Sequence, residues 1–206
     1  VHAHTTDSRH ALPVAANVLA RQFNPQAPNR AWVGDITYIR TRSGWLYLAV
    51  VLDLFSRRIV GWSMAPSMPA QLVCTALGMA IASRQPLPGL VVHSDRGSQY
   101  ASQDHTALLA RHGLVCSMSR KGNCLDNAVM ERFFLNLKME RVWQRDYANQ
   151  AEAQVDIADY IVGFYNATRL HATLGYRSPA QYEQQFPIPC ESLNLQKSPI
   201  GLSERT

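Results

Sequence analysis

The sequence predicts an α/β fold in which helices flank a mixed five-stranded sheet. Short apolar runs bounded by turn residues and longer segments with helical spacing follow one another in the order β-β-β-α-β-α-β-α-α, which is typical of such a sheet. Apolar residues make up 47% of the 206 residues, enough for the core of one domain. Acidic residues stand on the first strand and at the end of the fourth. We expect these two strands to be neighbours, which would bring the acidic residues together.

The first three strands are expected to form an antiparallel meander. Residues 32–40, 44–52 and 58–64 are rich in Val, Ile, Leu, Tyr and Trp, as strands usually are. The segments 41–44 and 53–56 between them contain Gly, Ser and Asp, which favour turns. Short turns of this kind connect neighbouring antiparallel strands.

Helices and strands are expected to alternate in the rest of the domain. Residues 69–84 carry apolar side chains at helical spacing, and the helix should end before Pro86. Apolar spacing and turn residues also predict the later elements. These elements are a strand over 89–95, a helix over 102–112, a strand over 114–118, a helix that carries Glu131 and a helix over 150–166.

The two ends of the chain differ from its middle. Residues 1–28 contain several prolines and little periodicity, so they are interpreted as a linker with a short helix over 14–21. Residues 29–185 are expected to form the core domain, and residues 186–206 a flexible polar tail. No stretch of about 18 uninterrupted apolar residues is present, which argues against a membrane span, and the first residues lack the pattern of a signal peptide.

The net charge indicates a kind of partner, and the cysteine content indicates a cellular compartment. The net charge of +5 favours a polyanion such as nucleic acid. The four cysteines are widely separated and form no Cys-x-x-Cys pair, which is typical of buried thiols in a reducing compartment and argues against a zinc module. We therefore expect a cytoplasmic protein with no membrane partner.

Three carboxylates have a spacing that suggests a catalytic site. Asp35 lies within one predicted strand, Asp95 ends another and precedes a turn, and Glu131 follows on a helix. Two carboxylates on strands and one on a helix can hold two divalent metal ions about 3.5–4 Å apart, an arrangement used for phosphoryl transfer on nucleic acid. Hard oxygen ligands favour Mg²⁺ or Mn²⁺ over zinc. A single such carboxylate could equally be a solvated edge residue or a turn cap, so the prediction depends on all three.

Other titratable residues are better explained by structural roles. Asp53 stands at a strand end before two arginines, where turn capping or a local ion pair is expected. Asp104 opens a helix and complements its dipole. His93 lies close to the second carboxylate; it either supports the site or packs and bonds in the core, which is the commoner role.

The helix that carries Glu131 has one narrow polar line. At 100° per residue, Asn127, Lys138 and Arg145 all fall within about 40° of Glu131, while the rest of the helix is largely apolar. Such a line suits the wall of an active site on which these three residues contact DNA. The structural alternative is a solvated stripe in which Lys138 is a neighbour of Glu131.

Two basic segments are further candidates for DNA contact. Lys121 lies in a Gly-containing loop before the helix that carries the third carboxylate. Residues 165–182 combine aromatic and basic side chains, among them Arg169 and His171, which suit stacking and phosphate contacts. Alternatively this segment docks back on the domain, with Pro179 starting a short helix. The residues alone do not favour either interpretation.

Five motifs together resemble the integrase core of bacterial insertion-sequence transposases, the DDE enzymes closest to retroviral integrases. They are WVGDITYI at 32–39, VLDLFSR at 51–57, HSDRGSQY at 93–100, GNCLDNAVME at 122–131 and LGYRSP at 174–179. Found in this order, the motifs are highly specific. The resemblance covers roughly residues 29–185.

The resemblance implies a ribonuclease-H-like fold in which Asp35, Asp95 and Glu131 bind two Mg²⁺ or Mn²⁺ ions and the protein cleaves and joins DNA strands. It also implies transposon ends and target DNA as partners, a homo-oligomer in the active complex, and action at the bacterial nucleoid. In that family a helix-turn-helix that recognises the DNA ends lies upstream of the core, and this chain is expected to begin after it.

Two other functions compete with strand transfer. A ribonuclease-H-like nuclease would only hydrolyse its substrate, and a catalytically silent module would only bind DNA or assist assembly. The intact set of three carboxylates argues against the silent module. A strand-transfer assay with a pre-cleaved DNA end separates transfer from hydrolysis.

Overall fold

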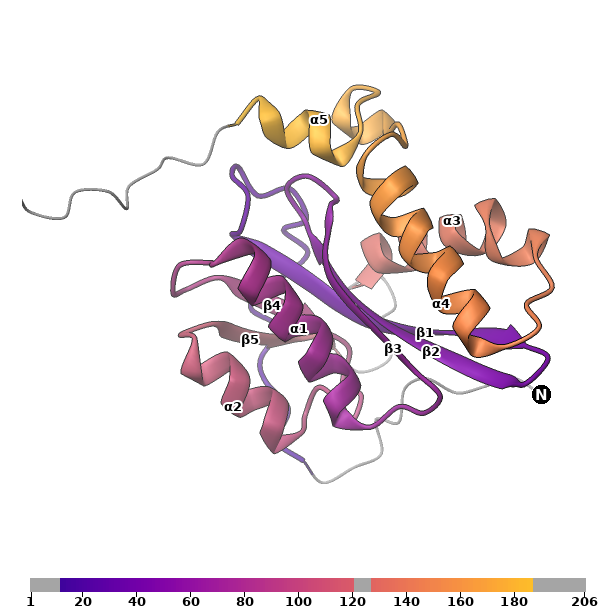
Figure 1. Ribbon diagram of the computed structural model, residues 1–206. Helices are drawn as coiled ribbons and strands as arrows, with labels where there is room; N and C mark the ends of the chain where they lie inside the picture. Colours follow the sequence, from indigo (N-terminus) through magenta and orange to yellow (C-terminus); the bar gives the residue numbers. More distant parts are fainter. Residues whose placement is uncertain (1–11, 121–126, 187–206) are drawn as a thin grey trace, which may run out of the picture.

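The computed structural model describes residues 12–120 and 127–186, and Figure 1 shows a five-stranded sheet covered by helices. The strands are β1 (Ala31–Thr41), β2 (Gly44–Asp53), β3 (Ile59–Ala65), β4 (Val91–Ser94) and β5 (Val115–Met118). The α-helices are α1 (Ala70–Arg84), α2 (Gln103–Arg111), α3 (Ala128–Glu140), α4 (Gln150–Asp159) and α5 (Pro179–Gln184). Each predicted strand and helix from β1 to α4 is present, with ends shifted by one to a few residues.

The sheet has the mixed topology that the sequence predicts. Its strand order is β3-β2-β1-β4-β5, with β1, β2 and β3 antiparallel and with β4 and β5 parallel to β1. The first and fourth strands are therefore neighbours, as expected. In this pair Val33 lies opposite His93. Asp35 is two residues after Val33, and Asp95 is two residues after His93, so the two aspartates stand at equivalent positions.

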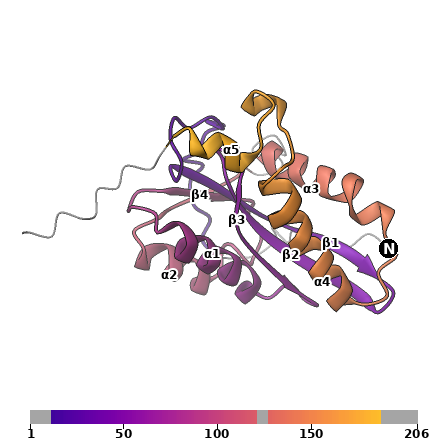
Figure 2. The same cartoon turned by 45° about the horizontal axis from the view of Figure 1, so that its top comes forward.

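Helices cover both faces of the sheet. In Figures 1 and 2, α1 and α2 lie on one face and α3 and α4 on the other. The central strand supplies both cores, because alternate side chains of a strand point to opposite faces. Val33 and Ile39 pack with α3 and α4, whereas Trp32 and Ile36 pack with α1 and α2. Burial on both faces explains why β1 is a nearly continuous apolar run.

Two predicted helical features differ in the structure. Residues 14–21 form no helix, because Ala20 and Arg21 have left-handed backbone angles and the amides of Val18 and Leu19 donate to Ser117 Oγ on β5. Leu19 is only 5% exposed, so the described part of this segment packs on the domain.

The second difference concerns the helix of Glu131. Helix α3 ends at Glu140 and a short 3₁₀ turn follows, so Arg145 lies beyond the helix and does not continue its polar line. The prediction extrapolated ideal helical angles through a segment with no glycine or proline to mark the end.

The C-terminal elements agree with the predictions. The helix expected over residues 150–166 is present as α4 followed by a π-helical segment, Tyr160–Asn166. Pro179 starts α5, whose N-terminus has a capping box formed by Ser178 and Gln181. No helix among residues 12–120 and 127–186 is both long and apolar enough to cross a membrane.

Candidate active site

Two of the three predicted catalytic carboxylates lie side by side on neighbouring strands. Asp35 is in the middle of β1, and Asp95 directly follows β4. Asp35 Oδ1 accepts a hydrogen bond from the amide of Ile36 at 2.7 Å, and Asp95 Oδ1 accepts one from the amide of Gly97 at 2.8 Å. The second bond forms the turn that the sequence predicts after β4. Both carboxylates are thus oriented by main-chain donors next to them.

Helix α3 brings the third carboxylate to this corner. Asn127, at the N-terminus of α3, donates from Nδ2 to Asp35 Oδ2 at 2.7 Å. Its side chain therefore does not cap its own helix. Glu131 lies four residues further on, about one turn along the helix, and its residue is exposed. The start of α3 is tied to Asp35, and this places Glu131 beside the strand carboxylates.

Electrostatics link the three carboxylates. The pKa of Asp35 is raised well above its usual value by burial and by the charge of Asp95, with a further contribution from Glu131; hydrogen bonds from Ile36 and Asn127 oppose this rise. The pKa of Tyr100 is also raised well above its usual value, first by burial and then by Asp35 and Asp95. These negative charges act on one another at one place in the fold. A bound cation would relieve their repulsion.

The chemistry of the donors fits a divalent ion, although the side chains do not form a closed cage. Within the described ranges, no three His, Cys, Asp or Glu side chains form a group that could hold a metal ion as they lie. Asn127 donates to Asp35 through its amide, and its Oδ1 is buried with no hydrogen-bond partner among the described residues. Glu131 is exposed. Hard oxygen atoms of this kind suit Mg²⁺ or Mn²⁺.

The competing titratable residues have the structural roles expected for them. His93 is fully buried, with Nδ1 2.9 Å from Ser117 Oγ and Nε2 3.1 Å from Ser119 Oγ, so it packs beneath the site. Both ring nitrogens thus have a serine hydroxyl as a partner. Asp53 accepts from the amides of Asn29 and Phe55, as a turn residue does.

The ion pair of Asp53 and the position of Asp104 are also those of structural residues. The arginine beside Asp53 is Arg84 on α1, at 3.4 Å, rather than one of the two arginines that follow it in sequence. Asp104 lies in the first turn of α2, as predicted.

The residues predicted to contact DNA lie in different surroundings. Asn127 is 7% exposed and bonded to Asp35, as described above. Lys138 is half-buried, with its ammonium 4.8 Å from the centre of the Tyr38 ring. Arg145 is exposed, 3.9 Å from Asp156. Lys121 lies outside the described residues. A role in DNA contact stays a prediction for all four.

The segment that carries Arg169 and His171 docks back on the domain. Arg169 binds the Glu140 carboxylate through Nε and Nη2, at distances of 2.6–2.9 Å. The His171 ring packs edge-on against Tyr165, and burial followed by the charge of Arg169 lowers its pKa to about 4. Docking is one of the two alternatives left open by the sequence. Whether Arg169 and His171 also contact DNA stays a prediction.

Sequence reasoning missed the contact of Tyr100 with the acidic corner. Tyr100 is buried, and its ring and hydroxyl lie 3.4 Å from the position that a Cβ atom at Gly34 would occupy. Gly34 therefore leaves space for the tyrosine beside Asp35. In the sequence, Tyr100 is noticeable only as the last residue of the motif at 93–100. No pattern along the chain places it next to β1.

Comparisons with known proteins agree with this geometry. A family model described as "Integrase core domain" matches residues 25–124, and a second model with the same description matches residues 112–179. Transposase InsF for insertion sequence IS3fB from Escherichia coli (strain K12) is 48% identical over 176 residues, which are 85% of this chain and 61% of the relative. The insertion element IS600 uncharacterized 31 kDa protein from Shigella sonnei is 47% identical over 182 residues, which are 88% of this chain and 67% of the relative. The chain spans about three-fifths of the length of the InsF relatives it matches.

Solved structures show the same fold at low sequence identity. A chain of the simian T-cell lymphotropic virus intasome in complex with PP2A regulatory subunit B56 gamma aligns with a TM-score of 0.65 and 18% identity, covering 98% of this chain and 66% of that one. The HTLV-2 integrase catalytic core domain in complex with magnesium (trimeric form) aligns with a TM-score of 0.60 and 17% identity, covering 77% and 99%. Identities this low establish a shared fold only.

Proposed function

This chain belongs to the integrase core domain family and has its ribonuclease-H-like fold, and we propose that it is the DDE catalytic core of a bacterial insertion-sequence transposase that cleaves and joins DNA strands. One observation carries the proposal. Asp35 lies on β1 and Asp95 follows β4, its neighbour in the sheet, while Asn127, about one turn before Glu131, donates to Asp35 Oδ2 at 2.7 Å. The charges of Asp95 and Glu131 contribute to raising the pKa of Asp35, which agrees with this arrangement. The 48% identity to a transposase over 85% of this chain supports the same activity.

We propose that Asp35, Asp95 and Glu131 hold two Mg²⁺ or Mn²⁺ ions. Bound ions of this type supply positive charge at the attacking and leaving oxygens of a phosphodiester. Asn127 would keep one oxygen of Asp35 in place, since its amide already donates to that oxygen. The amide of Gly97 would hold Asp95 in the same way. The HTLV-2 integrase catalytic core domain forms a complex with magnesium, and that metal agrees with the donor chemistry found here.

The proposed reaction is an in-line displacement at phosphorus. In cleavage, a water oxygen forms a new bond to phosphorus, the opposite P–O bond breaks, and a 3′-hydroxyl is released. In joining, that 3′-hydroxyl oxygen attacks a target phosphodiester, and the departing 3′ oxygen takes up a proton from solvent. Each step forms one P–O bond and breaks one, and the attacking oxygen comes from water or from DNA rather than from a side chain.

The proposal extends to partners and to the unit that acts. Transposon ends and target DNA would be the substrates, the active complex would be a homo-oligomer, and the reaction would take place on DNA in the bacterial cytoplasm. Residues 29–185 would form the catalytic core, residues 1–28 a connecting segment and residues 186–206 a tail.

A strand-transfer assay tests this function. The 206-residue chain would be incubated with Mn²⁺, a plasmid target and labelled duplexes that end in the terminal repeat of its own element, with the 3′ end pre-cleaved. We expect labelled product joined to the plasmid, and none with Glu131→Gln. Shortened DNA without joined product would favour the hydrolytic nuclease. DNA binding without either product would favour the silent module.

A further inference from the structure

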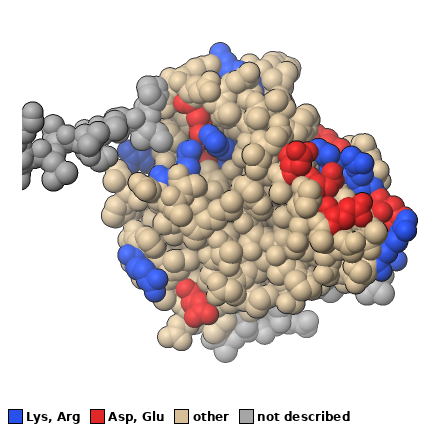
Figure 3. Space-filling model, viewed as in Figure 1, with Lys and Arg blue, Asp and Glu red and all other residues tan. Residues whose placement is uncertain are grey.

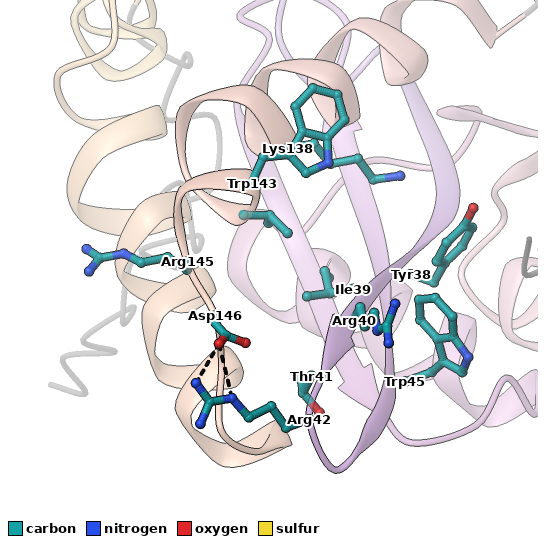
Figure 4. A pocket seen from close by; sticks show the side chains of 11 residues that line it. Tyr38, Ile39, Arg40, Thr41, Arg42, Trp45, Lys138, Trp143, Arg145 and Asp146 are labelled. Atoms are coloured by element: carbon teal, nitrogen blue, oxygen red, sulfur yellow. Dashed lines mark hydrogen bonds and ion pairs between the residues drawn. The ribbon is translucent and has the colours of Figure 1, made fainter. Parts of the chain in front are cut away.

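A groove of about 600 Å³ opens beside the acidic corner, and the predicted DNA contacts account for only part of it. Its walls are the outer end of the β1–β2 hairpin, the last turn of α3 and the segment that follows (Figure 4). The fold leaves this space because β4 pairs with β1 only over Ala31–Val33. Beyond that point β1 has β2 as its one sheet neighbour among the described strands, so its outer half borders the groove.

The groove is strongly cationic. Four cationic side chains line it against a single carboxylate, Asp146, which is already paired with Arg42. Arg40 is exposed and forms no ion pair with any described residue. In Figure 4 the ammonium of Lys138 points toward Tyr38 on the opposite wall, whereas Arg145 points away from the other labelled residues. Arg40 and Lys138 are therefore available to an anion between the walls.

Aromatic rings line the same groove. Tyr38 and Trp45 pack edge to face, with ring centres 5.2 Å apart. Trp143 follows α3 and is 65% exposed, although a tryptophan is usually well covered. An exposed indole between cationic side chains offers a flat surface to a second aromatic ring, and nucleic-acid bases stack on such surfaces.

The groove lies a short distance along β1 and α3 from the acidic corner. Along β1, Tyr38 lies three residues beyond Asp35, a separation of about 10 Å. Along α3, Lys138 lies seven residues beyond Glu131, again about 10 Å. Both walls of the groove thus begin in elements that carry the carboxylates. Tyr38 leaves β1 on the face opposite to Asp35, so a strand leaving the corner would reach the groove by crossing the edge of β1 that β4 does not cover.

We propose that this groove binds an unpaired stretch of the DNA strand that leaves the catalytic corner, with phosphates at Arg40 and Lys138 and a base stacked on Trp143. This inference rests on the proposed function. A single strand fits the groove better than a duplex, because the bases of a duplex are stacked on one another and offer no free face to an indole. Backbone contacts alone would leave the exposed ring unused.

Binding measurements without metal test the groove separately from catalysis. Fluorescence anisotropy in EDTA would follow a short labelled oligothymidine and a duplex of the same length. We expect Trp143→Leu to weaken oligothymidine binding about tenfold and to change duplex binding by less than about twofold. Trp143→Phe should restore most of the affinity, because a phenyl ring still stacks. Arg40→Gln should reduce the magnitude of the salt dependence by about one phosphate contact.

The matched control is Arg111→Gln, which removes an exposed arginine on α2 and should leave both affinities unchanged. Unchanged oligothymidine binding by Trp143→Leu would overturn the proposal, and so would equal weakening for single strand and duplex. Glu131→Gln separates this test from that of the proposed function. It should lose strand transfer and keep oligothymidine binding, so the groove and the catalytic assignment can fail independently.

Discussion

Two groups of carboxylates in this protein have opposite electrostatic surroundings. At the acidic corner, burial and the charges of Asp95 and Glu131 raise the pKa of Asp35. At the other group, Glu183 on α5 accepts hydrogen bonds from Arg84, Arg58 and Ser56. Burial by itself raises the pKa of Glu183, but these bonds and the charges of the arginines lower it below its usual value.

The contrast separates a structural use of carboxylates from a functional one. Arg84, Arg58 and Glu183 hold α5 against α1 and the turn before β3, and both charges of the Arg84–Glu183 pair lie on side chains only 11% exposed. Figure 3 shows that most acidic side chains on this face lie beside basic ones. The negative charge at Asp35 is opposed mainly by neutral hydrogen-bond donors. The excess negative charge at the acidic corner supports the proposed cation site, whereas the neutralised group around Glu183 stabilises the fold.

The largest effect is expected for Glu131→Gln. This change should lower strand transfer by about a hundredfold or more, because it removes charge where the reaction needs it. The free energy of unfolding should change by less than about 0.5 kcal/mol, since Glu131 is exposed. Gel assays of joined product and denaturant unfolding check the two halves. More than a few per cent residual transfer would contradict the assignment.

Asp53→Asn is the control for that prediction. Asp53 is fully buried and accepts two main-chain hydrogen bonds away from the acidic corner. Its substitution should reduce stability while the folded fraction keeps its activity. Loss of activity in fully folded Asp53→Asn protein would contradict the assignment of Asp53 to a purely structural role.

Removing the cation of the neutralised group should destabilise the fold. Arg84→Met leaves Glu183 and Asp53 without their main cation, and loss of one partner of a buried pair costs about 3–5 kcal/mol. Denaturant unfolding measures this loss. The exposed pair of Arg42 and Asp146 is the control, because solvent screens it and Arg42→Met should leave the free energy of unfolding almost unchanged. Similar losses for both variants would show that burial does not distinguish these pairs.

The Glu183 group should also respond to acid. A carboxyl with a lowered pKa contributes stability above its unfolded-state pKa, and this contribution is lost as the pH falls through the folded-state pKa. Parent should therefore be more stable than Glu183→Gln at neutral pH, and the difference should shrink as the pH falls below about 4.3, the ordinary pKa of a glutamate. Thermal unfolding of both proteins across this range is the check. A difference that persists unchanged at the acid end would rule out ionisation of Glu183 as its cause.

The smallest effect is expected for Lys138, a cation that could partly neutralise the carboxylates of the acidic corner. If its ammonium contacts a phosphate, Lys138→Ala should weaken binding of end DNA and reduce the magnitude of the slope of log K against log salt by about one. If it merely offsets the carboxylates, the variant should lose stability without metal and keep its salt slope. Its position over the Tyr38 ring favours the first outcome. A salt titration of parent and variant on one duplex decides between them.

The sequence predicted features that depend on local pattern. Apolar runs located β1 to β5, and the motifs located the three carboxylates, because each signal lies within a few residues. The segment 14–21 was predicted wrongly, since its amides bind Ser117, about a hundred positions away. The same limit hid the partnership of Arg84 with Glu183.

The candidate site shows the same limit. Glu131 and Asn127 were recognised as facing the same way, but only the structure shows that Asn127 bonds to Asp35. Arg145 was misplaced because helix α3 ends before it. At the end of the helix, Arg141 forms ion pairs with Asp156 and Asp159 on α4. Contacts between distant segments decide both details, and no periodicity along the chain encodes them.

Metal-dependent stability tests the central claim most directly. The melting temperature of the parent chain and of a double variant, Asp35→Asn with Asp95→Asn, would be measured in EDTA and in a titration with Mn²⁺. Ions that bind only the native state should raise the melting temperature of the parent by about 3–6 °C at ten times the dissociation constant. The double variant should show no such rise and should be at least as stable as the parent in EDTA, because repulsion at the corner is gone. Equal stabilisation of both proteins by Mn²⁺ would contradict a metal site at these carboxylates.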